Sequence, residues 1–244
     1  MPYRTLLLDA DNTILDFFKC EKIALRSCLV HRGLPSDDET VAIYSAINDN
    51  QWKRLERREI SRQEVLVGRF RIFFDRLGYD GNPSEMQDEY TEALAGQNFL
   101  MEGALDVCRS LSGEYDLFIV TNGNSYNQHK RIDSSPVRPY LLDVFISEEL
   151  GEDKPSQAYF EEVANRIRTR TGRFEKDEVL LVGDSLSSDI AGGNRFGIDT
   201  CFLSYGRTDC PGFPEYRSTY TIHDIRELPD LLKVCKDHAD GTVD

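Results

Sequence analysis

Residues 5–13 of this 244-residue chain read TLLLDADNT, a short apolar run that ends in two carboxylates, Asp9 and Asp11. A continuous apolar run of this kind is typical of a parallel strand that is buried on both faces. We therefore predict a central strand over residues 3–9 (YRTLLLD), with the two carboxylates at its carboxyl end.

Comparable apolar runs recur along the rest of the chain. They are DLFIVT at 116–121, VFIS at 144–147, EVLLVGD at 178–184 and TCFL at 200–203. Helical patterns separate them, at 104–112, 125–132, 157–169 and 187–195. Strands that alternate with helices predict an α/β fold, here a three-layer, Rossmann-like parallel sheet of five or more strands with right-handed crossovers.

The long segment between the first two strand patterns is helical throughout. Apolar positions at helical spacing fall in four stretches, 18–29, 41–55, 65–77 and 86–94, with breaks near 33–35, 60–61 and 78–83. Four helices of this length suffice for a small bundle. The simplest organisation is a helical cap domain over residues 17–98, inserted into a core domain formed by residues 1–16 and 99–244.

Composition narrows the possible partners and location. A net charge of −14 repels nucleic acid and anionic lipid, so we expect neither as a partner. No apolar run approaches the ~20 residues that span a bilayer, and the start of the sequence lacks a signal-peptide core. We expect a cytoplasmic protein, monomeric or homodimeric.

The six cysteines form no C-x-x-C pair and are expected to be reduced and mostly buried.

Polar residues follow the predicted strands at the points where the strands end. In chain order they are Asp9, Asp11, Thr121, Asn122, Lys154, Asp184 and Asp189. Ligands of an open parallel sheet bind beyond the carboxyl ends of its strands, so these side chains are expected to converge on one site.

Such a set has the parts needed for phosphoryl transfer. Clustered carboxylates repel one another unless a hard cation lies between them, and Mg²⁺ is the best candidate. Lys154 and the Thr121 hydroxyl can donate to phosphate oxygens. The backbone N–H groups around Ala10, Asp11 and Asn122 could also donate to phosphate oxygens. The set favours transfer of a phosphoryl group from a small-molecule phosphate ester to a carboxylate and then to water.

Each motif also has an ordinary structural interpretation. Asp and Asn are common in turns at strand ends, Asn122 could cap a helix, and an isolated Lys154 would be a solvated side chain. The order and register of all the motifs, each after a predicted strand, favour a site over a series of unrelated turns.

The motifs DADNT, TNG, KP and GDSLSSD, in this order, resemble those of the haloacid dehalogenase superfamily of hydrolases. The resemblance covers essentially the whole chain, because the helical segment lies where that family carries its first-position cap. It implies that Asp9 attacks phosphorus to form an aspartyl-phosphate. It also implies that Asp11 protonates the leaving oxygen and then activates the water that hydrolyses the intermediate.

The resemblance also implies roles for the remaining residues. Thr121 and Asn122 hold the phosphoryl group, and Lys154 neutralises charge on the nucleophile and the phosphate. The implied Mg²⁺ ligands are the Asp9 side chain, the Asp11 backbone carbonyl and Asp184, with Asp189 supporting the metal or orienting Lys154.

Asp11 favours a phosphatase, because the dehalogenase branch of the superfamily lacks an acidic residue there. Asn12 stands where many members have Gly. ILDF after DADNT, IVTNG, and ISEELG before Lys154 are similar to the branch of pyrimidine 5′-nucleotidases and N-acylneuraminate-9-phosphate phosphatases. This finer resemblance makes a nucleoside 5′-monophosphate a substrate hypothesis. The alternatives are a phosphomutase, a dehalogenase and a non-catalytic phosphate-ligand-binding module.

Aromatic residues expected near the junction of core and cap have two possible roles. Trp52 and Phe17 either stack on a nucleobase or pack within the cap, whereas Phe18 is expected to pack. A basic cluster in the second predicted helix is expected to be a solvated face, and the alternative is that it binds an acidic group of the substrate. It comprises Lys53, Arg54, Arg57 and Arg58.

Overall fold

A parallel sheet with β1 near its centre organises the core. The structure, a computed structural model, describes residues 3–207 and 214–239. Within these residues the sheet has six strands in the order β3-β2-β1-β4-β5-β6, and all neighbouring pairs are parallel. The strands are β1 (Thr5–Asp9), β2 (Asp116–Thr121), β3 (Asp143–Ile146), β4 (Val179–Gly183), β5 (Asp199–Leu203) and β6 (Tyr220–Ile222).

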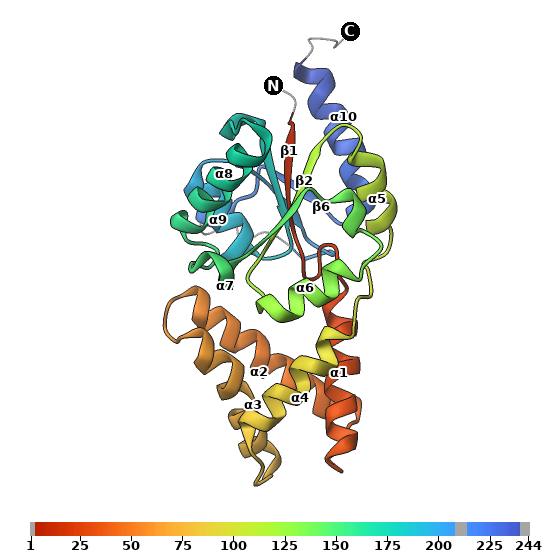
Figure 1. The fold of residues 1–244 in the computed structure, drawn as a ribbon, viewed down its shortest axis with the longest axis vertical. Helices are drawn as coiled ribbons and strands as arrows, with labels where there is room; N and C mark the ends of the chain where they lie inside the picture. Colours follow the sequence, from red (N-terminus) through yellow and green to blue (C-terminus); the bar gives the residue numbers. More distant parts are fainter. Residues whose placement is uncertain (1–2, 208–213, 240–244) are drawn as a thin grey trace.

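Helices cover both faces of this sheet (Figure 1). Leu6 and Leu8 of β1 pack in one apolar cluster with α5 (Ala104–Leu111) and α10 (Leu228–Ala239). Leu7 points the opposite way, into a second cluster with α8 (Gln157–Thr171) and α9 (Ala191–Phe196). Successive side chains of a strand alternate between faces, and both faces of β1 are apolar. The predicted three-layer α/β fold is confirmed.

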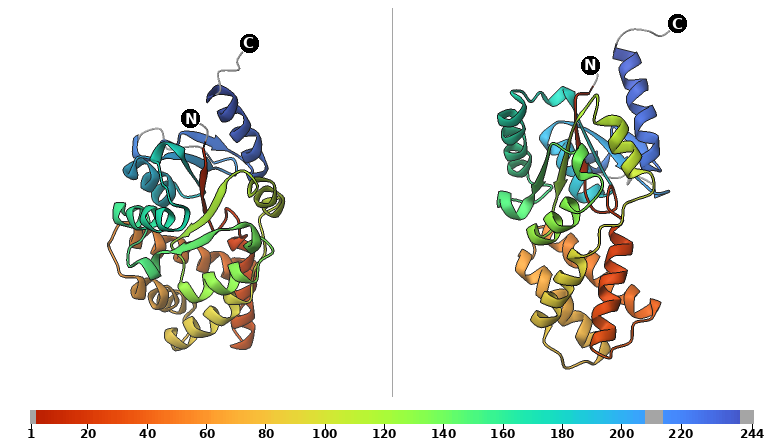
Figure 2. Two further views of the ribbon diagram at one scale, coloured as in Figure 1. Left: turned by 45° about the horizontal axis from the view of Figure 1, so that its top comes forward. Right: turned by 45° about the vertical axis from the view of Figure 1, so that its right-hand side comes forward.

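A helical insert follows β1 in the chain and precedes α5 and β2. Its helices are α1 (Phe17–His31), α2 (Asp38–Glu56), α3 (Arg62–Leu77) and α4 (Pro83–Ala95). Side chains cap their N-termini: Ser61 and Glu64 form a capping box at α3, and Asn82 precedes a proline at α4. The insert has its own apolar core and lies at one end of the sheet (Figure 1, Figure 2).

Stacked aromatic rings fill the centre of the insert. Tyr44 and Phe70 lie 5.1 Å apart between ring centroids, and Tyr90 packs against both. The prediction that Phe18 packs was wrong, because its side chain is 62% exposed. The buried residues of α1 recur at helical spacing, beginning with Cys20 and including Ala24 and Leu25, whereas Phe18 lies in the first turn, before the first of them, and its ring points outward.

Two chain segments join the insert to the core and run side by side. The Asp16 N–H donates to the Phe99 carbonyl at 2.9 Å, and the Met101 N–H donates to the Ile14 carbonyl at 3.0 Å. The insert also packs on α6 (Ser125–Asp133) of the core through α4. The proposed domain limits, 1–16 with 99–244 and 17–98, remain predictions.

The predicted helix over 187–195 is not continuous. A π-helical turn, η3 (Leu186–Ile190), precedes the short helix α9. Gly192 lies so close to Phe160 that a Cβ there would meet its ring at 2.5 Å, which keeps α9 tight against α8. The remaining short elements are η1 (Arg138–Tyr140), α7 (Ser147–Leu150), η2 (Lys176–Glu178), η4 (Pro214–Tyr216) and η5 (Ile225–Glu227).

The described cysteines agree with the expectation of reduced thiols. Cys20, Cys28, Cys108 and Cys201 are free and buried, and Cys235 is free and partly buried. Cys210 lies outside the described residues. Across residues 3–207 and 214–239, no helix is both long enough and apolar enough to cross a membrane.

Candidate active site

The predicted site residues line one cleft of about 510 Å³ between the core and the insert. The cleft lies at the carboxyl ends of the strands. The residues that it brings together are Asp9, Asp11, Thr121, Asn122, Lys154, Asp184 and Asp189. Ala10 lies in the same β1 loop and is fully buried.

A tight turn after β1 aims Asp9 into the cleft. The N–H groups of Ile14 and Leu15 both donate to the carbonyl of Ala10, at 3.0 and 2.8 Å. Asn12 in this turn has φ of 59°, in the left-handed region that Gly adopts freely and Asn tolerates. Asn12 is therefore compatible with this turn.

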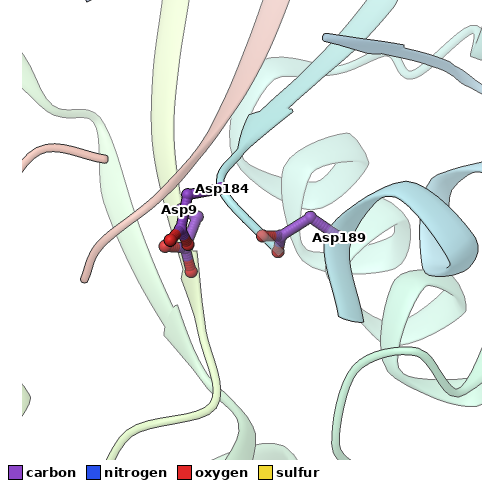
Figure 3. Close-up of side chains that lie close together, drawn as sticks. All are labelled: Asp9, Asp184 and Asp189. Carbon is purple, nitrogen blue, oxygen red and sulfur yellow. The ribbon is translucent and has the colours of Figure 1, made fainter. Parts of the chain in front are cut away.

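Three carboxylates meet at the centre of the cleft. Oxygens of Asp9, Asp184 and Asp189 lie within 4.8 Å of one another (Figure 3). Oxygen ligands at this spacing suit a hard divalent cation such as Mg²⁺. Asp11 contributes no side-chain oxygen to this group, which is compatible with the implied role of its backbone carbonyl.

Lys154 is a buried ammonium group that links two of the carboxylates. Its Nζ lies 2.7 Å from Asp9 Oδ1, 2.6 Å from Asp189 Oδ1 and 2.9 Å from the Val120 carbonyl. Burial alone would lower the pKa of Lys154, but the adjacent Asp189 and Asp9 carboxylates raise it above its ordinary value. The contact between Asp189 and Lys154 is compatible with a role in orienting Lys154, one of the two roles expected for Asp189.

Two cationic groups face these three carboxylates and leave one negative charge unbalanced: Lys154 contacts Asp9 and Asp189, and Arg207 Nη2 lies 3.5 Å from Oδ2 of the partly buried Asp184. Burial raises the pKa of Asp184 from 3.8 to about 7, and the neighbouring Asp189 adds to the rise. Burial also raises the pKa of Asp9 well above its usual range, although Lys154 opposes the shift. A cation among these oxygens would relieve the repulsion, so the donor set fits Mg²⁺ on electrostatic as well as geometric grounds.

Asn122 holds the loop of Lys154 with its side chain. Its Oδ1 accepts from the Lys154 N–H at 2.8 Å, and its Nδ2 donates to the Lys154 carbonyl at 2.9 Å. The peptide bond between Lys154 and Pro155 is cis. The side-chain amide of Asn122 is therefore occupied by the main chain of Lys154. The N-cap of α6 is Asn124, so the alternative in which Asn122 caps that helix was wrong.

Two residues on α6 that the sequence did not single out bind Asp11. Arg131 Nη1 lies 2.7 Å from Asp11 Oδ1, and Gln128 Nε2 lies 2.7 Å from Asp11 Oδ2. Gln128 Nε2 also donates to Thr121 Oγ1 at 2.8 Å. Their spacing of three residues, which places two long polar side chains on one face of a helix, was the signal available in the sequence.

The insert contributes the outer wall of the cleft. Trp52 and Phe17 both line it, and the guanidinium group of Arg62 lies 5.6 Å from the Trp52 ring centroid. Glu56 of α2 accepts a hydrogen bond from Ser187 Oγ at 2.6 Å, a contact between insert and core. Lys53 of the basic cluster lines the cleft as well.

Sequence comparison finds related proteins that match nearly the full chain. HAD-hydrolase YfnB of Bacillus subtilis is 37% identical over 95% of this chain and 96% of its own. Pyrimidine 5′-nucleotidase PynA of Streptococcus pneumoniae is 35% identical, again over 95% of this chain and 96% of its own. Pyrimidine 5′-nucleotidase YjjG of Escherichia coli is 28% identical over 97% of this chain and 100% of its own.

Solved structures match to a similar extent. The crystal structure of B. subtilis YfnB bound to magnesium, which reveals interdomain movement in that protein, has a TM-score of 0.88. It covers 95% of this chain and 99% of that chain at 37% identity. L-2-haloacid dehalogenase PA0810, with a TM-score of 0.70 at 13% identity, shares the fold alone.

A family match extends over residues 3–197 and is described as haloacid dehalogenase-like hydrolase. It includes β1 with Asp9, the helical insert, Lys154 and the β4 loop with Asp184. The resemblance predicted from the four motifs is confirmed. The chain belongs to the haloacid dehalogenase-like hydrolase family.

Proposed function

We propose that this protein is a Mg²⁺-dependent phosphomonoester hydrolase that uses Asp9 as its nucleophile. The observation that carries the proposal is the position of Asp9, which contacts the Lys154 ammonium group at 2.7 Å and lies within 4.8 Å of carboxylate oxygens of Asp184 and Asp189. A carboxylate that is held by a buried ammonium group, next to oxygens that suit a divalent metal ion, has the surroundings that an attack on an anionic phosphate ester needs.

Each residue has a distinct part in the proposed reaction. Asp9 attacks phosphorus and the ester oxygen leaves with a proton from Asp11; Asp11 then takes a proton from the water that hydrolyses the aspartyl-phosphate. Lys154 offsets negative charge on Asp9 and the phosphate, and Thr121 donates its hydroxyl to the phosphoryl group. A bound Mg²⁺ would be held by Asp9, Asp184 and the Asp11 carbonyl, with Asp189 beside it, and would stabilise the charge that develops on the phosphoryl oxygens.

The substrate class that we propose is a nucleoside 5′-monophosphate. Two relatives, PynA and YjjG, are named pyrimidine 5′-nucleotidases and match over nearly their whole length. The cleft of about 510 Å³ lies within the size range of small-molecule sites. Trp52 and Phe17 supply aromatic surface on its wall, which suits a nucleobase.

The test is phosphate release from p-nitrophenyl phosphate, with Mg²⁺ and with EDTA, followed by a panel of nucleotides, sugar phosphates and sialic acid phosphates. Asp9→Asn should abolish turnover, and EDTA should suppress it reversibly. Full activity of Asp9→Asn would remove Asp9 as the nucleophile.

The same assays separate the alternatives. A phosphomutase would yield an isomerised sugar phosphate in place of free phosphate, and a dehalogenase would release halide without metal. A binding module would hold a nucleotide tightly without hydrolysing it. Asp11 argues against the last two, since neither needs a second carboxyl group that exchanges protons with the substrate.

A further inference from the structure

We infer that Arg131 and Gln128 are positioning residues that fix the orientation of the Asp11 carboxyl group for proton transfer. The inference rests on the proposed function, in which Asp11 is the acid and base. Both Asp11 oxygens are bound from α6, Oδ1 by Arg131 and Oδ2 by Gln128, each at 2.7 Å. Two donors on separate oxygens fix the plane of a carboxyl group, and each oxygen keeps further acceptor capacity.

Arg131 carries its positive charge in a buried position, where the loss of hydration is costly in free energy. Its side chain is 1% exposed, and Asp11 is the one carboxylate that pairs with it among the described residues. Apolar residues usually fill such buried positions with equal or greater stability, so a buried ion pair is weak evidence of a stabilising role. The location of the pair in the cleft beside the proposed nucleophile favours a role in the reaction.

The same guanidinium group contacts both segments that join the insert to the core. Arg131 Nε donates to the Gln97 carbonyl at 3.0 Å, after α4, and the guanidinium lies 5.6 Å from the ring centroid of Phe17 at the start of α1. Its position is therefore defined by the insert on one side and by Asp11 on the other.

Gln128 connects Asp11 to the phosphoryl site. One nitrogen, Nε2, donates both to Asp11 Oδ2 and to Thr121 Oγ1, while Oε1 accepts from Arg131 Nη1 at 3.3 Å. Gly123 makes room for this side chain, because a Cβ at Gly123 would lie 2.3 Å from Gln128 Nε2. The TNG motif thus serves the placement of Gln128 in addition to its own contacts.

A misaligned acid matters most when the leaving group is poor. As the Asp9 oxygen bonds to phosphorus and the phosphorus–oxygen ester bond breaks, the leaving oxygen takes its proton from Asp11. A p-nitrophenolate ion leaves readily without that proton, whereas a phenolate ion depends on it more. The ratio of kcat/KM for phenyl phosphate to that for p-nitrophenyl phosphate therefore reports on the alignment of Asp11.

The experiment measures this ratio with Mg²⁺ for the wild type, Arg131→Met and Gln128→Met. Each variant should lower the ratio by about tenfold or more, within the range that general acid catalysis contributes. Asp11→Asn should lower it similarly, and combining Asp11→Asn with Arg131→Met should lower it no further, because the two residues act as one unit. Gln128→Met removes no buried charge and provides the test if Arg131→Met does not fold.

Asn98→Ala is the matched control. Asn98 Nδ2 donates to the Ser134 carbonyl at 3.0 Å, so this variant also removes a contact between the connecting segment and the end of α6, but none with Asp11. Its ratio should equal that of the wild type. If Arg131→Met and Gln128→Met lower kcat/KM equally for both esters, the inference is overturned while the proposed function stands. If the wild type hydrolyses neither ester, both are overturned.

Discussion

Arg62 of the insert donates a hydrogen bond from Nη1 to the main-chain carbonyl of Asn122 in the core, at 2.8 Å. Its Nη2 donates to Ser147 Oγ at 2.6 Å and also bonds the carboxylate of Asp153, next to Lys154. One side chain of the insert therefore touches the loops after β2 and β3, both of which supply residues to the cleft. Through Arg62, the position of the insert and the conformation of these two loops depend on each other.

Loss of the Arg62 contacts should lower activity more than stability. We predict that Arg62→Leu lowers kcat by about tenfold or more, because small displacements of reacting groups have large effects on rate. The assay is hydrolysis of p-nitrophenyl phosphate, with thermal unfolding measured in parallel. Arg71→Leu, an exposed arginine on the same helix, is the control and should behave as the wild type. Unchanged kcat in Arg62→Leu would show that the loops keep their order without it.

Magnesium should stabilise the protein more as the pH rises. In the metal-free fold the pKa of Asp184 is raised from 3.8 to about 7, so the folded state retains a proton that the unfolded chain releases. The contribution of this group to stability is present below about pH 4 and is lost as the pH rises through about 7. Mg²⁺ binds ionised carboxylates and should reverse that loss.

The measurement is the increase in Tm on adding saturating Mg²⁺, at about pH 5 and at about pH 8. At one hundred times its Kd a ligand adds about 2.7 kcal/mol, which corresponds to several degrees for a chain of this size. The increase should be larger at the higher pH and absent in Asp184→Asn. An equal increase at both pH values would contradict the assignment of Asp184 as a ligand.

Glu56 should make the contact between insert and core sensitive to pH. Burial raises the pKa of Glu56 from 4.5 to about 6, although the hydrogen bond from Ser187 opposes the shift. The contribution of Glu56 to stability is present below about pH 4.5 and is lost as the pH rises through about 6, and Glu56→Gln lacks this part of the loss. Between about pH 4 and about pH 8, the free energy of unfolding should shift in favour of Glu56→Gln by about 2 kcal/mol.

Chemical denaturation in metal-free buffer at several pH values tests the Glu56 prediction. Glu39→Gln, which changes an exposed carboxylate at the start of the same helix, should show no such shift. A pH-independent difference between Glu56→Gln and the wild type would mean that Glu56 titrates as an exposed group does.

Apolar runs were sufficient to predict most of the core from sequence. β1, β2, β4 and β5 are buried on both faces, so each appears as a continuous apolar stretch. β6 escaped prediction because it has three residues, one of them exposed, and depends on pairing with β5. Its register follows from tertiary contacts that no local pattern encodes.

The helical insert shows a second limit of local patterns. Its helix breaks were predictable from turn and capping residues such as Ser61 and Pro83, but the buried face of α1 was not. Polar Glu21 is buried there because Ser45 Oγ and Asn48 Nδ2, both on α2, donate to its carboxylate. Such long-range pairing cannot be read from the spacing of apolar residues.

Residues at the strand ends were predictable, and their partners were not. Parallel strands bring Asp9, Lys154 and Asp184 together by topology alone. Arg131 and Gln128 reach Asp11 from a helix whose rotation about its axis is set by packing against the insert. The use of the Asn122 side chain on Lys154 likewise depends on loop geometry.

The central claim is that a phosphoryl group is transferred to Asp9. The most direct measurement is to quench wild type and Asp11→Asn during turnover of p-nitrophenyl phosphate, reduce the acyl phosphate with borohydride, and locate the product by peptide mass spectrometry. We predict homoserine at position 9, more abundant in Asp11→Asn because hydrolysis of the intermediate is slowed. Homoserine at another aspartate, or none at position 9 while phosphate is released, would contradict the account.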